Sequence, residues 1–259
     1  MENIKNNIFL FIDLSYFIFH TYYAKKKYYE IQKKETTDLI NNKEFIEQFS
    51  NFDKKLTEIK KKLKLDKDIK VIFAKDCRRD DIWRNNIYSE YKQTRKVNNE
   101  VGDFFKYTYN NLIQKYNYLE CENCEADDLI GILTKNLYKD NKVYIITGDH
   151  DYLQLLYENV EIYDMKLNNL RNKSLGNRYN DLLHKILIGD KSDNIPAIHK
   201  KLGPKTVLKY LENNDELKKK LEDPDIFEIY NRNKILIDMD NIPDNLKKNI
   251  KKKFLETTF

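Results

Sequence analysis

The sequence predicts an α/β protein built on a mostly parallel central sheet with helices packed on its faces. Three short apolar runs, at residues 8–12, 70–74 and 142–147, have the length and composition of buried strands. Segments with apolar residues at helical spacing separate these runs, so strands alternate with helices along the chain. An aspartate follows each run, and the carboxyl ends of parallel strands are where open α/β sheets bind their ligands. We therefore expect one ligand site at this edge, near Asp13, Asp76 and Asp149.

The composition is that of a soluble, globular chain with one large domain or a core and a smaller lobe. The 259 residues are 41% apolar and 34% charged, which argues against intrinsic disorder. The apolar stretch at residues 8–19 is not expected to be a signal peptide, because Asp13 interrupts it and no cleavage site follows. No other run is long enough to span a membrane. Cys77, Cys121 and Cys124 are expected to be reduced thiols rather than a zinc site or redox pair, which indicates an intracellular location.

The net charge of +5 understates how basic most of the surface is expected to be. Nine acidic residues are assigned below to one cluster. Setting them aside changes the balance of 47 basic and 42 acidic residues to 47 − (42 − 9) = +14. A basic surface around an acidic pocket suits a polyanionic substrate.

The segment between the first two strands is expected to be helical. One helix is expected to begin near Ser15, and Asp13 would equally serve as its N-cap. Residues 44–64 have the apolar spacing of a single amphipathic helix, whose apolar stripe belongs to the core.

Basic and aromatic residues are interleaved after the second strand. If this segment is helical, Arg84, Tyr88, Tyr91 and Arg95 fall on one face. Cations beside stacking rings are typical of proteins that bind single-stranded or frayed nucleic acid. The alternative is a helix with a solvated basic edge and tyrosines packed inward. Residues 104–119 are expected to continue as helix.

Three carboxylates open the helix that is expected over residues 129–138. Glu125 and Asp128 are expected to share a face, with Asp127 turned aside. Acidic residues complement a helix N-terminus, but three in four positions exceed what capping requires. Carboxylates gathered beside apolar core stay ionised only with positive charge among them, which a divalent metal with oxygen ligands supplies.

Two further carboxylate pairs follow. Asp149 and Asp151 come directly after the third strand, and His150 between them is a weak ligand candidate. Residues 160–163 are expected to form another strand and residues 179–187 a helix, after which Asp190 and Asp193 lie three apart.

A Gly-Pro-Lys-Thr sequence at residues 203–206 opens an apolar-periodic helix over residues 207–211. Glycine followed by proline at a helix start leaves backbone N–H groups free to bind phosphate, and Lys205 adds charge. The same four residues would also suit an ordinary turn.

Six motifs in this order resemble the 5′-nuclease (flap endonuclease) superfamily. The similarity runs from about residue 8 to residue 211. It is nearest to phage-type 5′-3′ exonucleases, phage ribonuclease H and the 5′-nuclease domain of DNA polymerase I. The motifs are Asp13; Asp76 with Arg78, Arg79 and residues 91–95; residues 125–128; residues 147–151; residues 189–196; and residues 203–206.

The resemblance implies a PIN-like, mostly parallel sheet with a helical arch at about residues 78–122 and a C-terminal helix–three-turn–helix lobe. The expected division is a nuclease core at residues 1–180 and the lobe with C-terminal helices at residues 181–259. The lobe would hold duplex DNA by its backbone, with a K⁺ ion. The turn at residues 195–203 departs from the family pattern, with Ala197 in place of a glycine.

The resemblance also implies roles for individual residues. Two Mg²⁺ ions, which Mn²⁺ could replace, would be held directly or through water by Asp13, Asp76, Glu125, Asp127, Asp128, Asp149, Asp151, Asp190 and Asp193. Lys92 and Arg95 would neutralise charge on the scissile phosphate. Contacts with DNA are expected from Arg78, Arg79, Arg84, Tyr88, Tyr91, Lys96, Gly203, Lys205 and Thr206.

The implied function is hydrolysis of phosphodiesters near the 5′ end of flapped, forked or nicked DNA, or of an RNA–DNA hybrid. We expect a monomer that acts where DNA is replicated, with replication proteins as candidate partners. Phosphate contacts carry no sequence information, so specificity for structure is expected. The alternatives are a non-catalytic DNA-binding protein, which the complete carboxylate set disfavours, and a PIN-type ribonuclease, which typically has fewer carboxylates. A phosphatase with an aspartyl nucleophile would not account for the arch or the turn.

Overall fold

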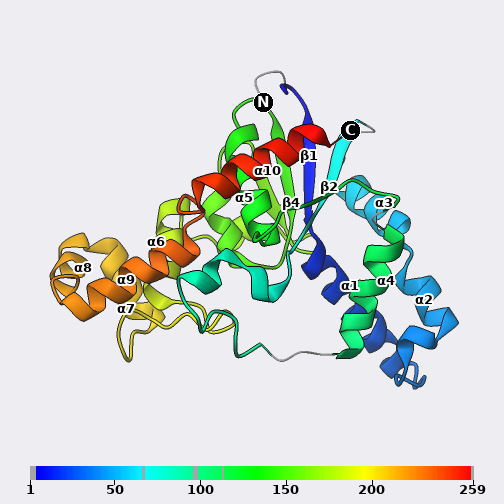
Figure 1. Ribbon diagram of the computed structural model, residues 1–259, viewed down its shortest axis with the longest axis horizontal. Helices are drawn as coiled ribbons and strands as arrows, with labels where there is room; N and C mark the ends of the chain where they lie inside the picture. The colour runs from blue at the N-terminus through cyan, green and yellow to red at the C-terminus, as the bar shows by residue number, and fades with distance from the viewer. Residues whose placement is uncertain (1–3, 66–67, 96–98, 113, 258–259) are drawn as a thin grey trace.

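The central sheet of the computed structural model is parallel throughout and lies between two helical layers (Figure 1). The structure describes residues 4–65, 68–95, 99–112 and 114–257. Within these residues the strand order is β3-β2-β1-β4-β5, which confirms the predicted fold class. The strands are β1 (Ile8–Asp13), β2 (Ile69–Lys75), β3 (Tyr118–Glu120), β4 (Lys142–Ile146) and β5 (Val160–Tyr163).

Helices cover both faces of this sheet and extend beyond its edges. None of the described helices is both long and apolar enough to cross a membrane. The α-helices are α1 (Leu14–Ile31), α2 (Lys43–Phe49), α3 (Phe52–Lys62), α4 (Asn99–Leu112), α5 (Ala126–Leu137), α6 (Arg178–Ile188), α7 (Pro204–Glu212), α8 (Asn214–Lys220), α9 (Pro224–Ile237) and α10 (Asp244–Glu256). Short 3₁₀ helices are η1 (Leu39–Asn41), η2 (Arg79–Asp81), η3 (Trp83–Asn86), η4 (His150–Leu155) and η5 (Leu170–Lys173).

The alternation of side chains along β1 divides the core into two layers. Phe9 and Phe11 point to one face and pack with α5 and α10. Leu10 and Ile12 point to the other face and pack with α1 to α4. All four side chains are fully buried, at about 1.5–3 kcal/mol each relative to exposure. The central strand is thus fixed from both sides, and so is the position of Asp13 at its end.

Three local expectations were wrong. Residues 44–64 form two helices, because the Asn51 side chain accepts a hydrogen bond from the Lys54 backbone N–H (3.3 Å) and starts α3 anew. Residues 84–95 form η3 followed by turns, so Arg84, Tyr88, Tyr91 and Arg95 do not share a helical face. The helix expected at residues 104–119 ends with α4, and β3 follows and pairs with β2.

The expected helical arch at residues 78–122 is only partly helical. Its first described part consists of η2, η3 and turns, and its last part is β3. Between them α4 packs beside α1, burying Val101 and Phe104 in the second core layer (Figure 1).

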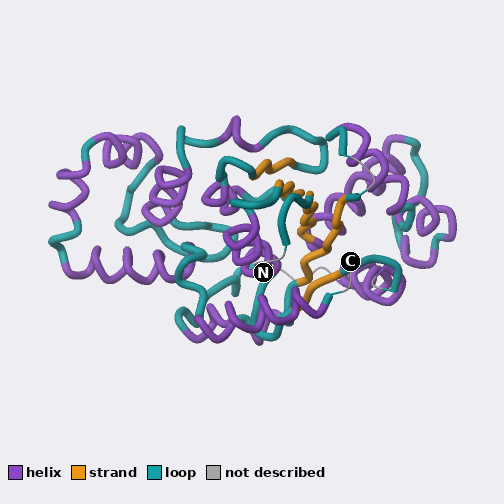
Figure 2. The backbone as a smooth tube through the Cα atoms, turned by 90° about the horizontal axis from the view of Figure 1, so that it is seen from above, coloured by secondary structure: helices purple, strands orange, loops and turns teal. Residues whose placement is uncertain are grey.

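The C-terminal residues divide between two places. Helices α7, α8 and α9 lie together at one end of the molecule, and α1 to α4 lie toward the other (Figures 1 and 2). The turns at residues 189–203 join α6 to α7, as expected for a helix–turn–helix element. By contrast, α10 packs on α5, where Ile250 and Phe254 enter the core. The division at residues 180 and 181 stays a prediction; it would fall inside α6 and would separate α10 from the core that it covers.

Candidate metal centre

Three aspartates meet at the carboxyl edge of the sheet because three adjacent strands end there. Asp13 is the last residue of β1, Asp76 follows β2, and Asp149 follows β4 after two residues. Gly148 allows this last turn to approach α1, since a Cβ at this position would lie 2.4 Å from the Tyr16 ring. The predicted convergence of Asp13, Asp76 and Asp149 therefore follows from strand order and one close backbone approach.

Short polar contacts orient Asp13 and Asp76. The Tyr16 backbone N–H donates to Asp13 Oδ1 (3.0 Å), and the Thr147 hydroxyl donates to Asp13 Oδ2 (3.3 Å). Asp13 is therefore both the N-cap of α1 and a member of the acidic edge. Asp76 Oδ1 accepts from the Ala126 backbone N–H (2.7 Å), and Ser15 donates to its other oxygen. This contact fixes the N-terminus of α5 against the end of β2.

The first turn of α5 places two neighbouring aspartates in different environments. Glu125 and Asp128 form a capping box, in which Asp128 Oδ2 accepts from the Glu125 backbone N–H (2.9 Å). This bond turns Asp128 into the protein, where its side chain is fully buried. Asp127 instead lines the acidic cavity together with Glu125. The expectation that Asp127 is turned aside was wrong, because the capping geometry turns Asp128 away from the cavity.

Arg84 is buried among these carboxylates and is not available to contact DNA, contrary to expectation. Its side chain is 2% exposed, and its guanidinium lies 2.8 Å from Glu125 Oε2 and 2.9 Å from Asp128 Oδ1. Its Nε donates to the Leu236 carbonyl (2.7 Å), which ties η3 to the end of α9. Trp83 Nε1 also donates to Asp128 Oδ2 (3.0 Å). These contacts hold Asp128 in place inside the protein, although burial raises its pKa more than Arg84 lowers it.

Tyr91, Lys92 and Arg95 connect α5 to the turn after α6. The Tyr91 hydroxyl donates to Glu125 (2.9 Å) and Asp193 (3.1 Å), and the ring is 3% exposed. A ring this buried cannot stack on a base, so the expected contact of Tyr91 with DNA was wrong. Lys92 pairs with Glu125 and lies 3.5 Å from Asp193, and Arg95 pairs with Asp193. Both cations line the cavity, as their expected role at a phosphate requires.

A lysine that the sequence did not single out, Lys185, lies between Asp151, which follows β4, and Asp190, which follows α6. Lys185, near the end of α6, is 2.6 Å from Asp151 Oδ1 and 2.5 Å from Asp190 Oδ2. Gly189 ends this helix with a φ of 73°, and a Cβ there would lie 2.3 Å from the Ile195 carbonyl oxygen. Lys185 also lines the cavity, where its ammonium occupies the space between two predicted metal ligands.

The nine predicted carboxylates therefore form two groups. In the described part of the chain, the open carboxylates have no close cation; Arg84 approaches one of them, Asp127, only to 3.7 Å. They are Asp13, Asp76, Asp127 and Asp149. Each of the paired carboxylates has at least one salt bridge to Arg84, Lys92, Arg95 or Lys185. They are Glu125, Asp128, Asp151, Asp190 and Asp193.

Burial raises the pKa of carboxylates in both groups, and the pKa of Asp151 reaches about 7 although Lys185 lowers it. Burial raises the pKa of Asp13 to about 7, and the neighbouring charges of Asp76 and Asp149 add to this. Burial also raises the pKa of Asp127, which Arg84 opposes only in part. Burial alone would raise the pKa of Glu125 too, but Lys92 and Arg84 outweigh it and hold this pKa at about 2. Nearby positive charge thus does not offset the burial of Asp13 and Asp127, whereas at Glu125 it does.

This arrangement fits a divalent metal. The cavity has a volume of about 460 Å³ and is lined by all four open carboxylates and by Glu125. In the described residues, carboxylate oxygens of Glu125, Asp127 and Asp128 also lie within 4.8 Å of one another, but Arg84 contacts all three and Asp128 does not line the cavity. Oxygen donors are the ligands that Mg²⁺ and similar hard cations prefer. Positive charge at this point would also remove the repulsion that raises the pKa of Asp13.

The remaining predicted DNA-binding residues lie around the cavity or in the distant lobe. Arg78 and Arg79 are exposed beside it, and Tyr88 is half-buried under the Arg232 guanidinium, 4.4 Å from its ring centre. Lys96 lies outside the described residues. Gly203, Lys205 and Thr206 form the start of α7, where Lys205 is exposed and Gly203 and Thr206 are half-buried.

A parallel α/β sheet whose carboxyl edge gathers carboxylates and cations in one cleft defines a metal-dependent phosphodiesterase. Residues 8–180 match the family described as the 5′-3′ exonuclease N-terminal, resolvase-like domain. The chain belongs to this 5′-3′ exonuclease family, which confirms the expected family and class of enzyme.

Individual relatives agree with this assignment. The chain is 29% identical over 217 residues to a 5′-3′ exonuclease of Buchnera aphidicola, covering 80% of this chain and 71% of that protein. It is 27% identical over 207 residues to ribonuclease H of Enterobacteria phage T4, covering 70% of this chain and 68% of that protein.

Solved structures show the same fold. A bacteriophage T5 protein co-crystallised with metal ions matches with a TM-score of 0.66 at 15% identity, covering 96% of this chain and 99% of that one. A T5 flap endonuclease in complex with DNA and metal ions also matches with a TM-score of 0.66, at 16% identity. These likenesses extend over the C-terminal helices that lie beyond the family match.

Proposed function

We propose that this chain is a Mg²⁺-dependent, structure-specific 5′ nuclease that hydrolyses phosphodiesters near the 5′ end of branched, flapped or nicked DNA. The observation that carries the proposal is the group of open carboxylates, which line one cleft with two cations, Lys92 and Arg95, on its wall. A cleft that lacks positive charge at its floor and has cations at its side suits bound metal ions and an incoming phosphate.

Two ions would be held by Glu125 and the open carboxylates, with Asp151, Asp190 and Asp193 close enough to contribute through water. When bound, such ions supply Lewis acidity and offset the charge of the scissile phosphate during attack by water. The chain's own residues keep the ligands in place: Thr147 orients Asp13, and Ser15 with the Ala126 N–H orients Asp76. Mn²⁺ would fit the same oxygen donors.

Lys92 and Arg95 would act on the substrate. Both side chains line the cleft together with the carboxylates, so a phosphate bound there would meet their positive charge. Preorganised cations of this kind stabilise charge that grows on phosphate oxygens. Because both are already fixed by Glu125 and Asp193, they need little reorganisation when a substrate arrives.

The lobe of α6 to α9 would hold the duplex away from the cut. The first turn of α7 offers backbone N–H groups beside the exposed Lys205, which suits a phosphate of the DNA backbone. Contacts of this type set position without reading bases, so the enzyme would select structure rather than sequence. A K⁺ ion in the turn at residues 189–203, a monomeric state and replication partners remain predictions.

The test is cleavage of a 5′-labelled flap duplex, a nicked duplex and an RNA–DNA hybrid, each with Mg²⁺, Mn²⁺ or a chelator. We expect short 5′ products with either metal and none with the chelator. Similarity to the phage ribonuclease H makes the hybrid the informative third substrate. If purified, folded protein releases no product from any of the three, the proposal is wrong.

Lys92→Ala separates catalysis from binding. We expect turnover to fall by about 10²-fold while affinity for duplex changes little, because the ammonium acts at the scissile phosphate. Equal losses in both would make Lys92 a plain binding residue. Lys191→Ala, an exposed lysine near the same edge, is the matched control.

A further inference from the structure

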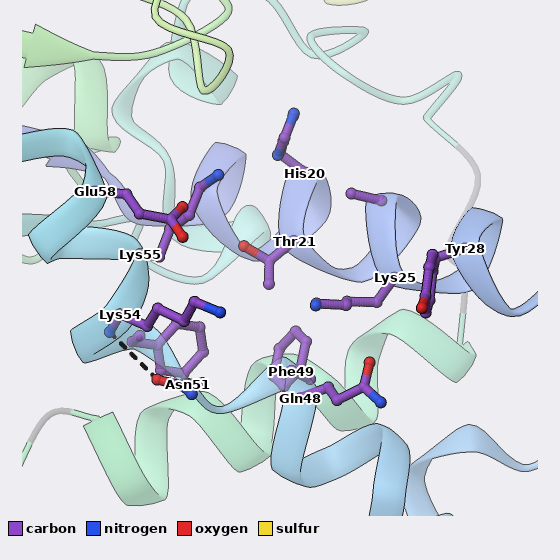
Figure 3. A pocket seen from close by; sticks show the side chains of 12 residues that line it. His20, Thr21, Lys25, Tyr28, Gln48, Phe49, Asn51, Lys54, Lys55 and Glu58 are labelled. Carbon is purple, nitrogen blue, oxygen red and sulfur yellow. Dashed lines mark hydrogen bonds between the residues drawn. The ribbon is translucent and has the colours of Figure 1, made fainter. Parts of the chain in front are cut away.

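A second pocket lies on the other side of α1 from the acidic cleft, where α1 faces α2 and α3 (Figure 3). Its volume is about 600 Å³. Phe49 and Phe52 form a buried aromatic floor, and Thr21 faces them from α1. None of its lining residues belongs to the metal centre, so it is a separate site.

The pocket is positively charged. Its lining includes Lys25, Lys54, Lys55 and one acid, Glu58, a balance of 3 − 1 = +2. Among the residues that the structure describes, none of these four side chains forms a salt bridge. This differs from the acidic cleft, where every lysine and arginine on the wall is paired with a carboxylate.

Two of the lysines point at each other. Figure 3 shows Lys25, from α1, and Lys54, from α3, extending into the space between the helices with their ammonium groups facing. Like charges that share a space repel, and an anion between them removes this repulsion. The position between Lys25 and Lys54 therefore favours an anionic group.

The rest of the lining suits a planar, partly polar group. The ring of Tyr28 is 47% exposed at one end of the pocket, where a base can stack on it. The Gln48 amide donates to Glu44 and the Asn51 oxygen accepts from the Lys54 N–H, and each keeps further amide groups in the lining. The Thr21 hydroxyl has no hydrogen-bond partner in the described structure. The volume exceeds what a phosphate alone would fill and lies within the range of small-ligand sites.

We propose that this pocket binds a nucleotide, with its phosphate between Lys25 and Lys54 and its base on Tyr28. The nucleotide is either free in solution or part of a polynucleotide strand. The second source rests on the proposed function. Thr21 lies eight residues along α1 from Asp13, on the order of 12 Å at the rise of an α-helix. Because the pocket is on the other side of α1, a bound strand would need more than about four nucleotides at 3.4 Å each to reach it from Asp13.

The key comparison is between two lysine pairs on α3. Lys54→Gln with Lys55→Gln removes two positive charges from the pocket. Lys61→Gln with Lys62→Gln removes the same charge from the exposed end of the same helix, outside the pocket. All four side chains extend from a helix surface without salt bridges in the described structure, so both variants are expected to fold with an unchanged thermal midpoint.

The first arm uses a free nucleotide. Binding of adenosine 5′-monophosphate is measured by titration calorimetry in a chelator, with adenosine and inorganic phosphate as partial ligands. We expect the pocket pair to weaken nucleotide binding at least fivefold and the control pair less than twofold. Adenosine and phosphate alone should each bind at least tenfold more weakly than the nucleotide.

The second arm uses a strand. Anisotropy in a chelator measures the affinity of wild type for flap duplexes whose strands are shortened one nucleotide at a time. We expect one step of at least fivefold in affinity as a strand stops reaching the pocket, and no such step in the pocket pair. Binding of the free nucleotide without the step in strand affinity would identify the ligand as a free nucleotide. The step in strand affinity without binding of the free nucleotide would identify it as part of a strand. Either outcome supports the proposal.

Equal effects of the two lysine pairs in both arms would overturn the proposal, because they would show a general effect of surface charge. Absence of both the nucleotide signal and the length step would overturn it as well. Both arms read binding without cleavage. If the protein cut no substrate with Mg²⁺, the proposed function would be contradicted, but the two binding measurements would still test the pocket.

Discussion

The open carboxylates line the cleft, the paired ones except Glu125 lie outside its lining, and the two groups differ in the cations close to them. Asp13, Asp76, Asp127 and Asp149 meet other acids, and the pKa of Asp13 is raised to about 7 by burial and by two of these neighbours. Glu125 lies among Arg84, Lys92 and Tyr91, and its pKa is held at about 2 although burial opposes this. The ionised carboxylate is therefore disfavoured at Asp13 and favoured at Glu125.

This difference separates two tasks. The paired carboxylates join distant parts of the chain, since Arg84, Lys92 and Arg95 come from the segment before α4, and Asp193 comes from the turn after α6. They hold the walls of the cleft together. In the described structure the open carboxylates have no salt bridge except the 3.7 Å contact of Asp127 with Arg84, and they would gain most from a bound cation. We therefore assign structure mainly to Asp128 and metal binding mainly to the open group.

The largest expected effect is on stability, from Asp128→Ala. This change leaves Arg84 buried with one partner fewer and removes the capping bond to Glu125. Loss of one partner from a buried ion pair costs about 3–5 kcal/mol. We expect the free energy of unfolding, measured with urea in a chelator, to fall by that amount. The exposed Asp80→Ala is the control, and an equally small change in both variants would refute the structural role of Asp128.

The neighbouring change, Asp127→Asn, is expected to act on activity. Its side chain lines the cleft and has no close salt bridge, so its replacement removes a metal ligand without breaking a buried pair. We expect turnover of a flap substrate with Mg²⁺ to fall by about 10²–10³-fold, the range for losing one preorganised electrostatic group. The unfolding free energy without metal should stay the same or rise. A variant that unfolds early but cuts normally would reverse our assignment of the two neighbours.

The sequence predicts the sheet and the acidic edge because their signals are local. Apolar runs mark β1, β2 and β4, and an aspartate follows each run directly or within three residues. The three-residue β3 has no such run, and it was predicted as helix because Leu119 is its only apolar aliphatic residue. Short edge strands depend on their neighbour for hydrogen bonds, which a single stretch of sequence does not show.

The division of the carboxylates could not be predicted because it depends on distant partners. Arg84 precedes Asp128 by 44 residues. We expected Arg84 to contact DNA, but its side chain is buried inside the protein. Whether Asp127 or Asp128 faces the cleft is decided by the capping box, and helical spacing alone favoured the wrong one. Lys185 gave no signal, because its contact with Asp190 crosses the end of α6 and the turn at Gly189.

The dependence of stability on pH gives a smaller effect that also tests the open group. The folded pKa of Asp13 is about 7 against an ordinary value of 3.8, so the folded chain binds this proton more tightly than the unfolded chain does. The stability linked to Asp13 is therefore complete below pH 3.8 and is lost as the pH rises toward 7. Asp13→Asn should be more stable than wild type by about 1–2 kcal/mol at pH 8 in a chelator.

The control for this effect is the same pair of proteins at low pH. At pH 4 both carry a neutral side chain at residue 13, so their urea midpoints should differ much less than at pH 8. Saturating Mg²⁺ should reverse the order at pH 8, because only wild type retains the ligand. A difference in urea midpoint that is constant from pH 4 to pH 8 would mean that the pKa of Asp13 is not raised in the folded chain.

The smallest expected effect comes from replacing Lys185. Its ammonium lies between Asp151 and Asp190 and must move before a metal ion can bind directly to both. Lys185→Met should therefore bind Mg²⁺ more tightly, by several-fold, although it lowers stability without metal. The measurement is the rise in thermal midpoint with Mg²⁺ concentration, which reports the metal dissociation constant. Lys191→Met removes an exposed lysine nearby and should leave that constant unchanged. An unchanged constant in Lys185→Met would show that lysine and metal do not compete, and Asp151 and Asp190 would then belong with Asp128 as purely structural anions.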